Sequence, residues 1–239
     1  MLNEIKEKYN SYMGIYDNVL PKIEDGVARR LLENSLYLSI FTSFESFLKK
    51  VIEHYVEEKI RGNIKYIELN EGFARAYILD KEREIDHIFN PNEIKSKKAF
   101  SRYFSGLKEP LSKAELTRYV HFEFLHESKL TNYYDMLFDQ ILGNKDFLKE
   151  IKIPFSSFSF DAGVEQVTTL DAHTFLLMYC SKIRNNIAHD NSNFNVSEIL
   201  FPDVIDCFIK IMESMKESYE NYTGFNLSTD IEQNLLDLA

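Results

Sequence analysis

Residues 182–190 concentrate the side chains that are best suited to chemistry. The segment reads Lys-Ile-Arg-Asn-Asn-Ile-Ala-His-Asp and follows a strongly apolar stretch. Arg184 offers a planar fork that suits a phosphate, and His189 can give or take a proton near neutral pH. Asn185 lies four residues before His189, so both share one face of a helix, and the long stem of Arg184 lets all three converge on one ligand.

An arginine and a histidine together suit RNA cleavage without a metal ion. In that reaction the 2′-hydroxyl attacks the adjacent phosphate, histidine acts as general acid or base, and arginine stabilises the developing charge. Lys182 and Asn186 adjoin the pair and are candidates for contacts with the substrate. A plainer alternative stays open, because cations near the end of a helix also interact favourably with its last carbonyl groups.

The motif Arg-Asn-Asn-Ile-Ala-His at residues 184–189 resembles the signature R-N-x-x-A-H of the HEPN superfamily, the higher eukaryotes and prokaryotes nucleotide-binding domains. The resemblance implies a helical bundle, commonly a homodimer whose two Arg-His motifs face one cleft. It often implies a metal-independent ribonuclease of toxin or antiviral defence systems. By the same resemblance, His189 is the acid or base, Arg184 the phosphate ligand and Asn185 an orienting residue.

An upstream helix extends the resemblance, because residues 36–48, from Leu36-Tyr37 to Phe44-Glu45-Ser46-Phe47-Leu48, look like the early HEPN helix that carries a glutamate among aromatics. Glu45 shares a face with Phe41 and Leu48, so an ionised carboxylate there needs a partner, for which Arg184 is the candidate. Alternatively, Glu45 lies at the solvated margin of the apolar stripe. Where many relatives have glycine after the histidine, this chain has Asp190, which either orients the imidazole or caps a turn.

A second candidate contact surface lies in the middle of the chain. It combines basic and aromatic residues, namely Lys95, Lys97, Lys98 and Arg102 with Phe100, Tyr103 and Phe104. Such a mixture can hold single-stranded nucleic acid, and Lys97, Lys98 and Arg102 are our candidate substrate contacts. The alternative is an amphipathic helix whose aromatic residues lie in the core and whose lysines are solvated.

The charge distribution limits how nucleic acid could bind. The net charge is −10, and residues 131–239 hold 17 acidic and seven basic side chains. This excludes a non-specific coat on duplex nucleic acid and opposes the approach of RNA to the motif. Basic residues of the 95–118 region, or a second copy of Arg184 and Lys182 in a dimer, could offset the acidic background.

The elements that must position these residues are helices, as 44% hydrophobic residues with only eight glycines and five prolines suggest. Apolar periodicity predicts helices over residues 3–19, 25–61, 130–142, 169–189 and 202–222. We expect Gly62 to stop the second, and Thr168 or Thr169 to cap the fourth with Asp171 in its first turn. The aromatic stripe of residues 37–55 is interpreted as core rather than a ligand site.

The predicted fold is therefore all-α: a helical bundle with a long central helix, short helices, and an irregular or edge-strand segment near 151–160, where Pro154 limits pairing. We expect one HEPN-like domain over residues 1–239, with an inserted or variable region at about 63–165. Turn signals within residues 63–130 indicate several short helices there.

The cysteines and the first residues of the chain indicate the cellular compartment and argue against a metal or a cofactor. Cys180 and Cys207 lie in apolar helical sequence without metal-ligand spacing, which favours inert thiols in a reducing compartment. The first residues lack the apolar core of a signal peptide, and no run is long enough to span a bilayer. We therefore expect a cytoplasmic protein with no membrane segment, no metal and no cofactor.

The sequence predicts a HEPN-type endoribonuclease that acts on RNA, leaves 2′,3′-cyclic phosphate ends and works as a homodimer. The resemblance implies a toxin or antiviral effector, with an antitoxin or defence-system protein as a possible partner. Two alternatives stay open: a non-catalytic module that binds RNA or a nucleotide, and a helical subunit of a toxin–antitoxin or defence complex.

Overall fold

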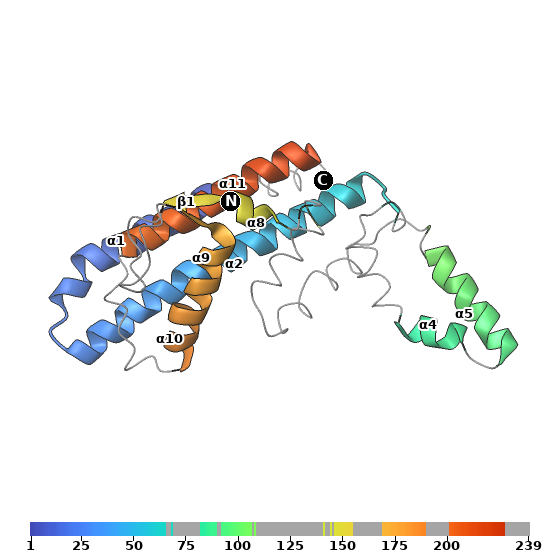
Figure 1. The fold of residues 1–239 in the computed structure, drawn as a ribbon, viewed down its shortest axis with the longest axis horizontal. Coiled ribbons are helices and arrows are strands. Elements are labelled where there is room, and N and C mark those ends of the chain that lie inside the picture. Colours follow the sequence, from blue (N-terminus) through green and yellow to red (C-terminus); the bar gives the residue numbers. More distant parts are fainter. Residues whose placement is uncertain are drawn as a thin grey trace, which may run out of the picture. The chain divides into compact units, whose positions relative to one another are not determined.

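The computed structural model describes residues 1–65, 68, 82–89, 92–106, 108, 141, 144, 146–154, 169–189 and 201–227. The chain divides into two compact units, one formed by Met1–Lys50 with Asp146–Ala239 and the other by Val51–Lys145. Helices dominate the described residues, so the predicted all-α class is confirmed (Figure 1). Most of the predicted helix at 130–142, residues 155–160 and the chain after residue 227 lie outside the described residues.

The first unit begins with a helical hairpin. Helix α1 (Leu2–Asn18) is followed by a 3₁₀ turn, η1 (Leu20–Lys22), and by the long helix α2 (Gly26–Arg61), whose residues up to Lys50 belong to this unit. The Asp25 carboxylate caps α2 by accepting hydrogen bonds from the backbone N–H groups of Val27 and Ala28, at 2.8 and 3.0 Å. The helix predicted over residues 25–61, with Gly62 as its stop, is thus confirmed.

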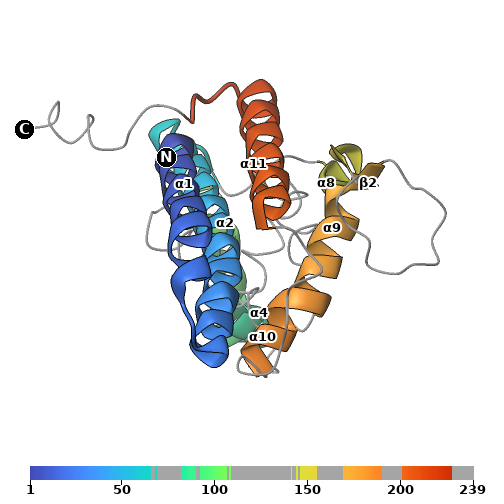
Figure 2. The same cartoon turned by 90° about the vertical axis from the view of Figure 1, so that its left-hand side faces the viewer.

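Helix α11 (Phe201–Thr223) lies beside α1 and α2 and completes this layer (Figure 2). Lys6 of α1 and Glu213 of α11 form an ion pair of 2.6 Å. The Tyr9 hydroxyl donates a 3.0 Å hydrogen bond to the Ile40 carbonyl, which ties α1 to α2. Gly224 ends α11 with a φ of 72°, a conformation that glycine adopts without steric cost.

Aromatic rings fill the space between these helices. Phe208 of α11 meets Phe44 of α2 at 5.1 Å and Tyr179 at 5.0 Å between ring centroids. All three side chains are almost completely buried. Burying such a side chain contributes about 1.5–3 kcal/mol relative to leaving it exposed. The stripe of residues 37–55 therefore supplies core residues, as predicted.

A small antiparallel sheet precedes the motif helix. Strand β1 (Lys152–Pro154) pairs with β2 (Thr169–Asp171), so the predicted edge strand is confirmed for residues 152–154. The predicted cap at Thr168 or Thr169 is wrong, and so is the placement of Asp171 in the first helical turn. Thr169 belongs to β2, and the Asp171 carboxylate caps helix α9 (Ala172–Met178) by accepting a 2.8 Å hydrogen bond from the Thr174 N–H.

The second unit contains two short helices that pack on one another, α4 (Glu82–Ile88) and α5 (Glu93–Gly106). Asn92 caps α5, since its side-chain oxygen accepts a 3.1 Å hydrogen bond from the Lys95 N–H. The prediction of short helices between residues 63 and 130 is confirmed where the chain is described. Whether about 63–165 is an insertion into a single domain stays a prediction.

Candidate active site on helices α9 and α10

The Arg-Asn-Asn-Ile-Ala-His motif lies at a change of helical type. Helix α9 continues into a π-helical turn, η3 (Tyr179–Arg184), and then into α10 (Asn185–His189) (Figure 2). The Asn185 N–H bonds to the Cys180 carbonyl, five residues earlier, which marks the wider turn. Arg184 thus ends the π-helical turn and Asn185 begins the α-helical one. Such π-turns occur frequently at functional sites.

Buried residues hold this helix against the core. Ile183 and Ile187 are at most 1% exposed. The Tyr179 hydroxyl donates a 2.8 Å hydrogen bond to the Tyr37 carbonyl of α2, and its ring stacks on Phe41 at 5.9 Å. These contacts fix the rotation of the helix, so the polar residues of the motif are held at its margin and on its exposed side.

Arg184 is half-buried and has two polar neighbours. Its guanidinium donates a 3.1 Å hydrogen bond to the side-chain oxygen of Asn185. It also interacts electrostatically with the half-buried Glu45 of α2: burial raises the pKa of the Glu45 carboxyl, and the Arg184 charge lowers it by less. Within the described residues no hydrogen bond or ion pair joins the two side chains, so the attraction acts over a longer distance.

The remaining motif residues are more accessible. His189 and Asn186 are exposed, while Asn185 is half-buried. Because α10 is α-helical, Asn185 and His189 lie four residues apart on one face. The backbone of Lys182 lies in the π-helical turn, but its side chain and Asp190 are outside the described residues. The motif therefore presents an imidazole to solvent next to a partly oriented guanidinium.

The other candidate contacts, Lys97, Lys98 and Arg102, belong to α5 in the second unit and are exposed. Phe100 and Phe104 on the same helix are 51% and 45% exposed. The alternative that places these aromatic rings in the core is therefore wrong for both, since α5 buries the small side chain of Ala99 instead. Tyr103 is half-buried.

Sequence reasoning did not foresee that a cysteine shares the environment of Arg184. Burial raises the pKa of the Cys180 thiol to about 12, with Arg184 acting against this shift and Glu45 adding to it. The i, i+4 spacing of Cys180 and Arg184 is the signal that could have indicated it. A thiol of such high pKa is protonated at neutral pH and is a poor nucleophile.

The part of the chain that the structure describes holds neither a metal-ligand cluster nor a membrane-spanning helix. No three histidine, cysteine, aspartate or glutamate side chains among them gather closely enough to hold a metal ion. No helix in that part of the chain combines the length and apolar character that crossing a bilayer requires.

Comparison with known families supports the resemblance that the motif suggested. A protein-family model described as RiboL-PSP-HEPN matches residues 2–221. Neither the curated proteins nor the solved structures contain a match to the chain. The matched span begins with the first residue of α1, ends near the end of α11 and includes residues 184–189. The chain therefore belongs to the RiboL-PSP-HEPN family.

Proposed function

We propose that this protein is a metal-independent RNA endonuclease of HEPN type. The observation that carries the proposal is the placement of Arg184 at the end of a π-helical turn and of Asn185 and His189 on one face of the α-helical turn that follows. Asn185 partly orients the guanidinium, and the imidazole of His189 is accessible. A rigid helix thus presents a phosphate ligand and a proton-transfer group close together along the chain.

The proposed reaction needs two proton transfers. His189 removes the proton from a ribose 2′-hydroxyl, whose oxygen attacks the adjacent phosphorus. The bond from phosphorus to the 5′-oxygen breaks, that oxygen takes up a proton, and the products are a 2′,3′-cyclic phosphate and a 5′-hydroxyl. Arg184 stabilises the extra negative charge on the phosphate oxygens. In a homodimer, His189 of a second copy supplies the second proton, which is a chemical reason for a shared cleft.

Glu45 adjusts the charge that Arg184 presents to RNA. An ionised carboxylate beside the guanidinium competes with a phosphate. Burial raises the pKa of the Glu45 carboxyl and the Arg184 charge lowers it by less, so the two groups respond to one another's charge. We therefore propose Glu45 as a positioning residue for Arg184, and Lys182 and Asn186 as further substrate contacts on the same helix.

The membership of the chain in a HEPN family also supports a role as a toxin or antiviral effector in the cytoplasm. A nuclease of this kind is harmful to its own cell when it is uncontrolled. We therefore propose that a partner, such as an antitoxin or another defence protein, keeps it inactive until it is needed.

Cleavage of labelled RNA in EDTA tests the catalytic proposal. Wild-type protein and the His189→Ala and Arg184→Ala variants are incubated with tRNA and a mixed-sequence RNA, and fragments are examined for 2′,3′-cyclic phosphate ends. We expect cleavage by the wild type and a loss of about 10²-fold or more in each variant. His87→Ala and Arg61→Ala, which change exposed residues outside the motif, serve as matched controls.

Two results would contradict the proposal. Equal cleavage by wild type and His189→Ala would mean that the imidazole has no part in the reaction. RNA binding without cleavage by the wild type would point instead to a non-catalytic binding module. Circular dichroism of each variant establishes that the helices remain folded.

A further inference from the structure

The motif helix holds one residue more than an α-helix would place between its two buried anchors. Ile187 follows Tyr179 by eight positions, and the two side chains are 0% and 1% exposed. Two turns of an α-helix take about seven residues. The Asn185 N–H bonds to the Cys180 carbonyl five residues earlier, where an α-helix would use the next carbonyl along the chain. The extra residue therefore lies in the π-helical turn between Cys180 and Asn185.

Asn186 shows what this extra residue changes. In an unbroken α-helix, Asn186 would follow Tyr179 by two turns and share the buried side of the helix with Ile183. Tyr179 and Ile183 are each 1% exposed, whereas Asn186 is exposed and Ile187 is buried. One added residue sets the side chains that follow back by about 100° around the helix axis. Ile187 therefore enters the core, and the helix avoids the cost of burying the polar amide of Asn186 there.

The same shift turns Arg184 toward the core. In an unbroken α-helix, Arg184 would lie two turns after Leu177, whose side chain is 46% exposed. Set back by about one position, Arg184 lies in line with Leu176 instead, which is 0% exposed. Arg184 is half-buried, and its charge acts on Glu45 of α2 and on Cys180. The wide turn thus directs the guanidinium toward α2 rather than toward the open side of the helix.

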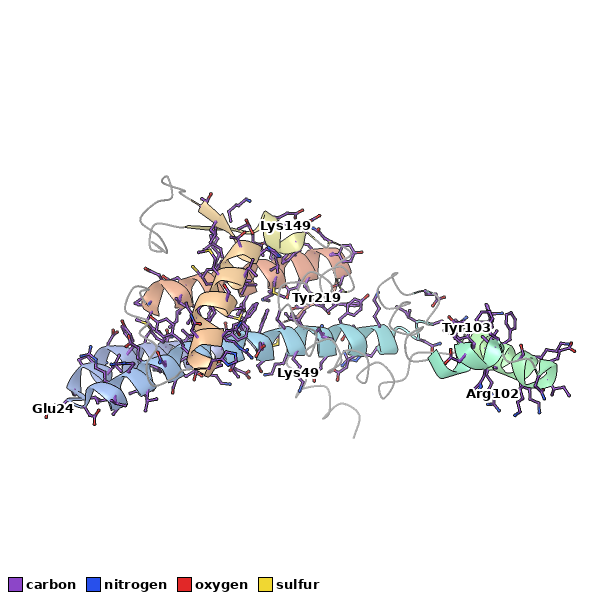
Figure 3. The ribbon with its side chains drawn as sticks, turned by 60° about the horizontal axis from the view of Figure 1, so that its bottom comes forward. Glu24, Lys49, Arg102, Tyr103, Lys149 and Tyr219 are labelled. Atoms are coloured by element: carbon purple, nitrogen blue, oxygen red, sulfur yellow. The ribbon has the colours of Figure 1, made fainter. Side chains whose placement is uncertain are left out.

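Contacts on both sides of the wide turn keep the helix from rotating. Before the turn, Tyr179 donates its hydrogen bond to the Tyr37 carbonyl and stacks on Phe41, where the helix from α9 to α10, drawn in orange, crosses α2 (Figure 3). After the turn, the side chain of Ile187 is fully buried. Because both anchors are fixed, the number of residues between them sets the direction in which Arg184 leaves the helix.

Ser181 is the residue of the turn that the core can spare. Its side chain is exposed, and its hydroxyl donates a 3.3 Å hydrogen bond to the Met178 carbonyl of the same helix. Cys180 and Ile183 are 4% and 1% exposed, so the removal of either would leave a cavity. Removing Ser181 shortens the turn without taking a side chain from the core.

We propose that the extra residue of the π-helical turn positions Arg184 for the phosphate of the substrate, by directing its guanidinium toward Glu45 and α2. This inference rests on the proposed ribonuclease function, since it concerns the same arginine. Ser181 contributes length to the turn and no reacting group, so it is a positioning residue. The direction of Arg184 can be measured without RNA, which separates this proposal from the proposal of cleavage.

Two deletions of a single residue test where the extra residue lies. Deleting Ser181 should convert the π-helical turn into an α-helical one while Arg184 and Ile187 keep their sides of the helix. We expect the urea midpoint and kcat to stay close to those of the wild type. Deleting the exposed Leu177 of α9 is the matched control, because it should move Tyr179 off its contacts with α2 and lower the urea midpoint. Equal losses of stability in the two deletion variants would overturn the proposal.

An exchange of two side chains tests the direction of Arg184 at unchanged chain length. Asn186→Ile with Ile187→Asn makes the unbroken α-helical register the one that buries isoleucine, so Arg184 should turn away from Glu45. In the wild type the Arg184 charge lowers the pKa of the Glu45 carboxyl. NMR titration of this carboxyl should therefore give a higher pKa in the exchange variant, as in Arg184→Gln. An unchanged Glu45 pKa in the exchange variant would overturn the proposal.

Kinetics of RNA cleavage test the consequence for the reaction. In the exchange variant kcat should fall about tenfold or more, because Arg184 no longer meets the charge that develops in the transition state. Asn186→Ala is the matched control, since it removes the same proposed substrate contact without changing the register and should alter KM alone. An unchanged kcat in the exchange variant would contradict the positioning role of the turn. A wild type that shows the expected Glu45 titration but no cleavage would support the assigned direction of Arg184 and reject the ribonuclease function.

Discussion

The guanidinium of Arg184 stabilises the ionised form of Glu45, a carboxyl group that burial on α2 shifts toward its neutral form. The burial effect is the larger of the two, so the pKa of Glu45 is raised. The same guanidinium donates a hydrogen bond to Asn185. Arg184 is therefore coupled both to the long helix and to its own motif, which makes its orientation sensitive to changes in either.

Glu45→Gln should alter how stability depends on pH. A carboxyl group with a raised pKa in the folded state binds its proton more tightly there, so its contribution to stability is complete below about pH 4.5 and is lost as the pH rises through the folded-state pKa. Glutamine does not titrate. Urea unfolding at several pH values should therefore show the variant gaining stability relative to wild type as the pH rises above about 4.5.

Glu4→Gln is the matched control, and it should give the opposite sign. The hydrogen bond and the charge of Lys50 lower the pKa of Glu4. Its contribution is present above about pH 4.5 and is lost as the pH falls through the folded-state pKa, so this variant should lose stability relative to wild type as the pH rises. If both variants followed the same trend, the assignment of Glu45 to a buried site beside Arg184 would be wrong.

Asn185→Ala should lower kcat more than it changes KM. The substitution removes the acceptor that orients the Arg184 fork but leaves the guanidinium charge in place. Misplacing a charge-stabilising group weakens an interaction that matters mainly in the transition state, so kcat should fall about tenfold or more. The neighbouring Asn186→Ala, a change at the exposed proposed substrate contact, should instead raise KM. Equal effects of the two substitutions on kcat would contradict the positioning role of Asn185.

Helix boundaries were predictable because their signals are local. Asp25 and Gly62 bracket α2 with capping and stop chemistry that needs no tertiary contact. The Arg-His motif was also predictable, because its residue types and their spacing can be read directly from the sequence. The cap at Asp171 was missed because Thr169 and Asp171 pair with β1, and that choice depends on a strand some 17 residues away along the chain.

Other features depend on packing that a single sequence does not display. No particular residue type is typical of the π-helical turn before Asn185. The apolar periodicity of the sequence therefore cannot predict it. The exposure of Phe100 and Phe104 is a second example, because the same apolar spacing suits either a core or a ligand surface. The placement of Glu45 beside Arg184 was proposed from charge, but only the crossing of two helices brings them together.

Asp171→Ala should destabilise the fold more than Thr169→Ala. The Asp171 carboxylate accepts hydrogen bonds from the Thr174 N–H at 2.8 Å and from the Thr174 hydroxyl at 3.0 Å. Losing an N-cap costs about 1 kcal/mol, measured as a shift of the urea midpoint at constant slope. Thr169 is exposed in β2, so its truncation should cost a few tenths of that. A larger effect at Thr169 would mean that threonine is the cap after all.

Tyr179→Phe should cost about 1 kcal/mol of unfolding free energy. The substitution removes the 2.8 Å hydrogen bond to the Tyr37 carbonyl while leaving the buried ring in place. Tyr222→Phe is the control, because that side chain is 62% exposed. Equal stability of the two variants in urea would mean that the hydrogen bond does not hold the motif helix to α2.

The two cysteines should report on opening of the core. Burial raises the pKa of Cys180 and of Cys207 to about 12 each, so almost no thiolate is present at pH 8. Both side chains are also buried, which blocks access by iodoacetamide. Mass spectrometry should therefore find no modification of native protein in minutes and two modified thiols in urea. Cys180→Ala should keep the cleavage activity, since a protonated thiol takes no part in proton transfer or attack. Rapid labelling of Cys180 alone, in folded protein, would show instead that the helix carrying Arg184 separates from the core.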